Sequence, residues 1–329
     1  MADNNINSNS NGNGNGNINS NSNSSNSNNN INSNGDSSSN NRIWKALRLA
    51  WRAIARVFGL LAISAKMDLA WLLRDTKYAA LGICGDVVNN AATVSGVFLI
   101  ASRFDGIGGM SADETLLMMA YSTMVTGIFT LFGAGNNIHV SRIIGRGQLE
   151  HLLVQPLPLG VQLATSGFAP FTGGSNLIAG AALLAVAAGR LGLRITLPWL
   201  AALAAYLLAT MAIIVARSYL VSSAAFYAPA AAEEISSDAI EGTWILSTFP
   251  LSGMPRFVQI PLLTIMPEGL MAWFPSLCLL GRPPLGMAAY YPMAFALLAS
   301  LAANLVFRKG LDHYARKGSN RYVPHGFRR

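Results

Sequence analysis

The sequence has few charged residues and very little cysteine. Only 12% of its 329 residues are Asp, Glu, Lys or Arg, whereas 52% are hydrophobic. An ordinary soluble domain carries about 25% charged residues. A chain with half that share lacks the solvent-facing material of a soluble enzyme, so the composition favours an integral membrane protein.

The sequence also lacks the common motifs of enzyme chemistry. It has no GxxxxGKS or GxxxxGKT to hold nucleotide phosphates, and no GxSxG around a serine. The two cysteines, Cys84 and Cys278, are too few for a disulfide framework or a thiolate metal site. The spacing of His139 and His151 does not match that of a helical metal pair. We therefore expect no enzyme activity and no metal or cofactor bound by this chain.

The first 41 residues form a segment of their own. Of these, 34 are Asn, Ser or Gly, none is aromatic and none is Lys or Arg. Such a segment cannot bury enough apolar surface to offset the entropy of ordering its backbone, so we expect residues 1–41 to be disordered. The segment also lacks the basic and apolar regions of a secretory signal peptide.

Residues 42–76 begin with an amphipathic helix. Over 42–61, apolar side chains recur every three or four residues, and basic side chains share another face. The residues that define the two faces are Trp44 and Trp51 on the apolar side and Lys45, Arg48, Arg52 and Arg56 on the basic side. This arrangement suits a helix in the membrane interface, and packing on a soluble partner is the alternative.

Residues 77–307 hold six apolar stretches and are expected to form an all-α transmembrane domain. Each stretch is long enough to cross the hydrocarbon core, for which about 20 helical residues suffice. The predicted spans are 79–102, 116–137, 161–187, 197–221, 256–274 and 285–307. The third and fourth are the clearest. Four prolines interrupt or border the fifth, so we expect a broken or re-entrant element over 255–284.

The basic residues predict the orientation. Fifteen of the 23 Lys and Arg residues lie in 42–77 and 308–329, so both ends of the chain are expected in the cytoplasm. Two cytoplasmic ends require an even number of spans. The charge of +8 is therefore a topology signal, and nucleic acid is not an expected partner. The acidic segment 223–243 is an exception, because it is placed on the cytoplasmic side.

Some polar residues fall inside the predicted spans. Charge within a membrane is costly and suggests function. Asp86 lies deep in the first span, where a packed polar contact and a cavity-lining role are equally expected. Arg217, Arg256 and Glu268 are expected at span ends, with side chains that reach the interface. The candidate residues for the translocation path or gate are Asp86, Asn89, Asn90, Pro267, Glu268 and Pro275.

The cytoplasmic loop 139–160 is the most informative stretch. The pattern of residues 148–155 predicts a helix of about two turns, which ends before Pro156. Leu149, Leu152 and Leu153 share one face of this helix, and charged residues surround it. Such a helix can dock into a groove of another protein, and a plain connector is the alternative.

At this loop the sequence resembles the membrane-spanning permease subunits of ABC type-2 transporters. The matching pattern is an apolar pair, a glycine, a short Leu-rich helix and a proline. The matching residues are Ile143, Ile144, Gly147, Leu149, Leu152, Leu153 and Pro156. The stretches from Ile265 to Arg282 and from Gly310 to Tyr322 also agree with an uncharacterised branch of this family. The resemblance covers residues 62–329.

The resemblance implies a mechanism and partners. The chain would form half of a pore with an identical or sister permease, and separate ATP-binding subunits, which hold the ATP and Mg²⁺, would dock below. The family generally exports, and the expected place is a bacterial plasma membrane. The loop would act as the coupling helix, and 255–284 would shape the outer gate. The coupling residues implied are Arg142, Arg146, Gly147, Leu149, Glu150, His151, Leu152, Leu153 and Pro156.

Two other classes of function stay open at this point. A secondary transporter or channel would need no ATPase, and such folds usually contain two related halves. The sequence shows no convincing internal repeat. A membrane enzyme or scaffold is the third class, and an enzyme would need convergent catalytic groups on one membrane face.

Overall fold

The computed structural model describes residues 33–104, 106–132, 139–165, 167–235, 249–283 and 286–318. These residues form helices and no strand, in agreement with the predicted all-α class. The chain divides into two compact units, residues 1–54 and 55–329. Most of the Asn/Ser-rich tail, residues 1–32, lies outside the described residues.

Helix α1 (Ser33–Arg74) begins in the first unit and continues into the second. The prediction placed its start at residue 42, so it was wrong for residues 33–41. The reason is that extending an existing helix costs much less than nucleating one, so a strong helix can continue into a weak sequence. Within the first unit, the side chains of Trp44, Lys45, Arg48, Trp51 and Arg52 are exposed. Arg56, the remaining residue of the predicted basic face, lies in the second unit and is exposed too.

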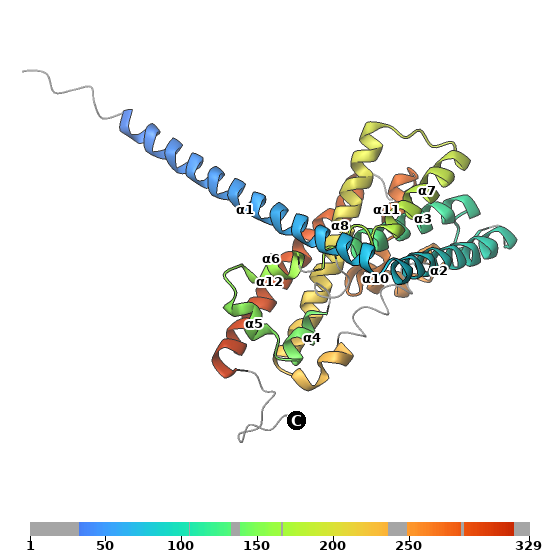
Figure 1. Cartoon of the computed structure of the whole chain (residues 1–329). Coiled ribbons are helices and arrows are strands. Elements are labelled where there is room, and N and C mark those ends of the chain that lie inside the picture. The colour runs from blue at the N-terminus through green and yellow to red at the C-terminus, as the bar shows by residue number, and fades with distance from the viewer. Residues whose placement is uncertain are drawn as a thin grey trace, which may run out of the picture. The chain divides into compact units, whose positions relative to one another are not determined.

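Four helices of the described residues are long and apolar enough to cross a membrane (Figure 1). They are α2 (Thr76–Arg103), α3 (Ala112–Leu131), α8 (Leu197–Ser222) with its short continuation η1 (Ser223–Phe226), and α12 (Tyr291–Lys317) preceded by η5 (Gly286–Tyr290). They match the first, second, fourth and sixth predicted spans.

The two most extensive helix contacts are between α3 and the shorter helix α7 (Ser175–Arg190) and between α8 and α12. Small residues allow α3 and α7 to approach closely. A Cβ atom on Gly180 would lie 2.6 Å from the backbone nitrogen of Met124. Small residues at such crossings are typical of helices that pack within membranes.

The third predicted span, 161–187, is not one helix. It is divided into α6 (Leu159–Thr165) and α7, which has only 16 residues. The sequence between them contains Pro170 and three glycines, which disfavour a helix. Hydrogen bonds to α3 hold the break open: Ala169 N donates to Leu131 O at 2.9 Å, and Thr130 Oγ1 donates to Gly173 O at 2.7 Å. The prediction of one span was wrong because it followed apolar length and passed over Pro170 and the glycines, and because the partners that fix the break are distant in sequence.

Residues 249–283 turn back on themselves. They form η3 (Leu251–Gly253), α10 (Arg256–Thr264), η4 (Pro267–Leu270) and α11 (Trp273–Leu279), with a bend of 72° between α10 and the following pair. Both ends of the segment contact the turn at 106–110. Gly253 packs against Gly108, and Arg282 Nη1 donates to Gly109 O at 3.0 Å. A pair of helices bent in this way forms either a broken span or a re-entrant loop, the two forms that the sequence predicts. Residues 249–283 are called the re-entrant segment below.

Helix α12 continues to Lys317, ten residues beyond the predicted end of the sixth span. The first part of the predicted basic tail, 308–317, is therefore helical. The buried side chains of Phe307 and Tyr314 explain the extension, because they pack this end of the helix against its neighbours. Gly310, between them, leaves room for the ring of Phe226. Residues 319–329 lie outside the described residues.

Candidate functional site

Two short helices, α4 (Val140–Gly145) and α5 (Leu149–Val154), form the predicted coupling loop. The turn between them needs a residue with positive φ, and Gly147 supplies it with φ of 68°. Helix α5 ends where predicted, because Pro156 forces the preceding Gln155 into an extended conformation. The side chain of Gln162 from α6 then donates to Leu152 O at 2.9 Å and to Leu157 O at 2.7 Å.

The apolar face of α5 points into the protein. Leu149 is fully buried, and Leu152 is partly buried against the same cluster. The prediction that Leu149 contacts another protein was therefore wrong, because its own chain covers it. The outward surface is formed by Glu150, His151, Leu153, Val154 and Pro156. Of these, Leu153 is 50% exposed and Val154 is 87% exposed.

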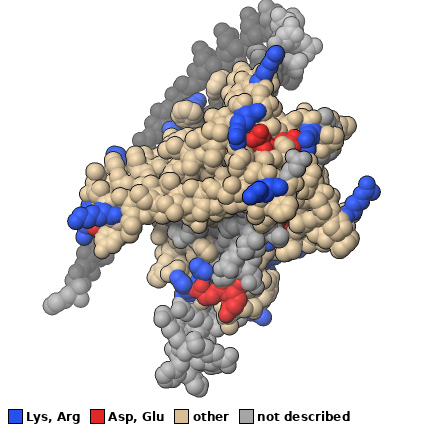
Figure 2. Space-filling model, turned by 90° about the vertical axis from the view of Figure 1, so that its right-hand side faces the viewer, with Lys and Arg blue, Asp and Glu red and all other residues tan. Residues whose placement is uncertain are grey.

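Glu233 joins the two predicted arginines of the loop. Its carboxylate lies 2.7 Å from Arg142 Nε and 2.9 Å from Arg146 Nη2. Figure 2 shows acidic side chains lying beside basic ones on the face turned to the viewer. The sequence reasoning missed this residue, although the acidic charge in 223–243 was the signal for it.

Helix α5 is also tied to the end of α12. Tyr314 donates a hydrogen bond of 3.1 Å to Glu150 Oε1. The Tyr314 ring packs edge-on against Phe226, which in turn packs against Phe307. These aromatic residues belong to the buried cluster that includes Leu149, so α4, α5, η1 and α12 share one core. A displacement of α5 would therefore be transmitted to α12.

His139 lies at the start of α4, outside the long apolar helices. Burial lowers the pKa of its imidazole from 6.5, and the positive charge of Arg142 lowers it further. Glu233 acts in the opposite direction, and Arg146 adds a smaller lowering effect. The neutral imidazole is therefore favoured in the folded protein.

An ion pair lies between α8 and the tip of the re-entrant segment. Arg217 Nη1 is 2.7 Å from Glu268 Oε1, with the two side chains only 13% and 1% exposed. The prediction that Arg217 and Glu268 reach the membrane interface was wrong, because each neutralises the other inside the protein. Arg256 is exposed at the start of α10, as expected of a residue at a helix end.

A second polar contact joins three elements in the core. Tyr121 of α3 and Thr210 of α8 form a hydrogen bond of 2.8 Å, and Thr210 donates a further bond of 3.4 Å to Leu270 O. Pro267 starts the short helix η4 that places Leu270, and it is buried. Pro275 is buried in α11. The two candidate prolines thus shape the re-entrant segment.

The opposite end of the second unit carries its own ion pairs. Glu114 at the start of α3 accepts from the Ser111 backbone and lies 2.6 Å from Arg282 Nη2. Asp113 lies 3.3 Å from Arg190 Nη1. The first pair joins the start of α3 to Arg282, which follows α11, and the second joins α3 to the end of α7. Sequence reasoning did not identify them.

The polar candidates on α2 are not gathered at one place. Asn90 donates to Asn176 Oδ1 of α7 at 2.5 Å, so it is a packing contact. Asp86 and Asn89 are exposed on α2. The structure therefore does not bring Asp86 together with Glu268 or with the prolines. Among the described residues, no three His, Cys, Asp or Glu side chains are grouped to hold a metal ion.

Comparison with known proteins gives one match. The family model described as ABC-2 family transporter protein matches residues 87–318. No curated protein and no solved structure matches the chain.

Proposed function

The chain belongs to the ABC-2 transporter family, and we propose that it is the permease subunit of an ATP-driven exporter that works with separate ATP-binding subunits. The family match covers most of the chain and includes the α4–α5 loop and the re-entrant segment. It supports a multi-pass membrane protein that acts in transport.

The exposed surface of α5 carries this proposal. Leu153 and Val154 are exposed apolar residues at the tip of a helix whose other face is anchored by Leu149. Glu150 and His151 add polar groups beside them. An amphipathic helix with a fixed inner face and an exposed apolar tip suits docking into a groove of another protein. We assign that groove to an ATP-binding subunit.

The route of coupling runs from α5 to α8 and α12. Movement of the docked subunit would shift α5, and the Glu150–Tyr314 contact and the shared core would carry the shift to α12. Helix α12 packs along α8, which holds Arg217 against the re-entrant tip. The motion thus reaches the segment that we propose as the gate at the opposite end.

A second permease, identical or related, would complete the pathway. Helix α2 supports this, because it is the least covered of the long helices and carries Asp86 and Asn89 on its exposed surface. A carboxylate that faces lipid is costly, whereas one that faces a pore or a partner is not. ATP and Mg²⁺ would bind only in the ATP-binding subunits, and both termini would lie in the cytoplasm of a bacterial cell.

A purified complex tests this proposal. The chain is isolated in mild detergent from the membranes of its own host, and bound ATPase activity is measured. We expect V154D to lose the bound ATPase activity, because it places a charge at the docking tip. The control L197D changes a similarly exposed apolar residue at the first position of α8. Equal ATPase activity in the two variants would contradict the proposal.

A further inference from the structure

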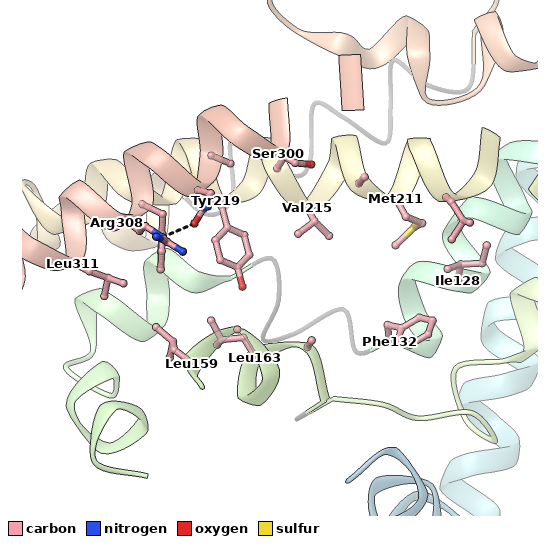
Figure 3. Close-up of a pocket in the computed structure, with 18 residues that line it drawn as sticks. Ile128, Phe132, Leu159, Leu163, Met211, Val215, Tyr219, Ser300, Arg308 and Leu311 are labelled. Atoms are coloured by element: carbon pink, nitrogen blue, oxygen red, sulfur yellow. Dashed lines mark hydrogen bonds between the residues drawn. The ribbon is translucent and has the colours of Figure 1, made fainter. Parts of the chain in front are cut away.

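A cavity of about 820 Å³ lies between α3, α6, α8 and α12 (Figure 3). Its volume falls within the range of about 300–1,000 Å³ that small-molecule pockets show. Met211 and Val215 point into it from α8, and Leu159 and Leu163 face them from α6. Most of its wall is therefore apolar.

One wall of the cavity differs from the others. Helix α12 contributes Ser300, Asn304 and Arg308, which follow each other at intervals of one helical turn. Arg308 Nε donates to Asn304 Oδ1 at 2.9 Å (Figure 3). A guanidinium carries five N–H donors, and this bond uses one. The Tyr219 hydroxyl lies at the same end of the cavity.

The surroundings of the cavity indicate where an occupant would come from. Leu208, which lines it, is 72% exposed, and Leu301 and Leu305 on the adjoining face of α12 are also exposed. These residues belong to the apolar parts of α8 and α12 that are long enough to cross a membrane. The opening therefore faces the lipid phase.

We propose that this cavity binds a membrane amphiphile with an anionic head group and an apolar tail. The tail would fill the space between α6 and α8, and the head group would accept hydrogen bonds from Arg308. Arg308 places a positive charge at this end of the cavity, so the cavity attracts a negatively charged head group there. The site lies within a single permease, so it goes beyond the proposed coupling to ATP-binding subunits.

Photolabelling in vesicles tests this site directly. The purified chain is placed in phosphatidylcholine vesicles with a single-chain phosphate lipid that carries a diazirine in its tail. We expect label on peptides that contain Leu163 and Val215. A second probe has the same tail and an uncharged hydroxyl head. We expect it to label on the order of tenfold less, because charge-assisted hydrogen bonds are the strong ones.

Three variants separate the charge from the shape of the cavity. R308Q should remove the preference for the phosphate head, and R308K should keep most of it. K309Q removes the neighbouring charge without changing the cavity wall and should behave as wild type. A212W fills the cavity and should prevent labelling by both probes.

Several results would overturn the proposal. They are equal labelling by the two head groups, labelling that survives A212W, or the same preference in R308Q and K309Q. Thermal unfolding checks that each variant is folded. If R308Q does not fold, R308K still tests the proposal, because it is expected to keep most of the preference for the phosphate head. The assay contains no ATP, so failure of the proposed coupling would leave its outcome unchanged.

Discussion

Arg217 of α8 and Glu268 at the tip of the re-entrant segment form a buried ion pair with 2.7 Å between Nη1 and Oε1. The pair fixes the point at which the re-entrant segment meets α8. Beside it lies a smaller cavity of about 290 Å³, which Arg217 lines with Thr264 and Pro267. A change in the position of α8 would therefore act on the tip of this segment.

Breaking the pair should destabilise the protein strongly. We expect E268Q to lower the free energy of unfolding by about 3–5 kcal/mol, because it removes the buried negative charge that lies 2.7 Å from the Arg217 guanidinium. The double variant R217M/E268M should recover most of the loss, since apolar residues can replace a buried pair. Thermal unfolding in detergent measures both.

The exposed pair Asp113–Arg190 is the control for this prediction. Its side chains are 38% and 51% exposed, so D113N should cost less than about 1 kcal/mol. If E268Q and D113N shifted the melting temperature equally, the structural role assigned to the Arg217–Glu268 pair would be wrong.

Substitutions at Leu149 and Leu153 should affect different properties, the stability of the protein and its coupling to the ATP-binding subunit. L149A removes a fully buried side chain and should cost about 2–5 kcal/mol of stability. L153A changes an exposed side chain, so the melting temperature should stay near that of wild type while ATPase activity associated with the chain falls. Loss of stability in L153A, or full stability in L149A, would contradict the anchoring of α5.

Glu233 should hold α4 in place through Arg142 and Arg146. We expect E233Q to raise hydrogen exchange of the α4 amides by roughly fivefold, since exposed ion pairs contribute up to about 1 kcal/mol. E234Q is the matched control, because Glu234 is the exposed neighbour and, within the part of the chain that the structure describes, no ion pair joins it to α4. Similar exchange in the two variants would show that Glu233 does not brace the loop.

Asp68 of α1 should hold the break between α6 and α7. Its carboxylate accepts from Phe171 N at 2.8 Å, Thr172 N at 3.1 Å and Thr172 Oγ1 at 2.6 Å. We expect D68A to speed hydrogen exchange at these amides by at least about tenfold, because hydrogen bonds to a charged group contribute about 1.5–3 kcal/mol. The control is D75N. Asp75 precedes α2 and its side chain makes no capping hydrogen bond to that helix, so D75N should leave the exchange of the Phe171 and Thr172 amides unchanged.

His139 should make the loop sensitive to acid. In the folded protein the pKa of the His139 imidazole is lower than its unfolded value of 6.5. At a pH between these two pKa values, the unfolded chain therefore binds more protons than the folded protein. Stability should therefore fall as the pH drops below about 6.5 and stay level above it. H139Q should weaken this dependence in thermal unfolding at about pH 7.5 and about pH 5.5. An unchanged pH profile in H139Q would contradict the assignment.

The long helices and the end of α5 could be predicted from the sequence, because they depend on local properties. Apolar length predicts α2, α3, α8 and α12, and Pro156 acts on its direct neighbour. Pro170 and the three glycines near it are a local signal for the break between α6 and α7. The hydrogen-bond partners that fix the break, Asp68 and Leu131, could not be predicted, because they come from distant parts of the chain.

The candidate site shows the same division between local and distant effects. The position of the loop could be predicted, but the helix face that points outward could not. Which leucines are exposed depends on the packing of Phe226, Phe307 and Tyr314 against α4 and α5. Likewise, Arg217 and Glu268 each look like residues at a span end until the re-entrant fold brings them together.

Site-specific photocrosslinking in the membranes of the native host tests the central claim most directly. A photoreactive amino acid is placed at Val154 on α5 or, as the control, at Leu197 at the far end of α8, since the two are 87% and 81% exposed. We predict that position 154 captures a protein whose peptides include a GxxxxGKS or GxxxxGKT nucleotide-binding sequence and that position 197 does not. No such protein at position 154, or equal capture at both positions, would contradict the claim that α5 docks on an ATP-binding subunit.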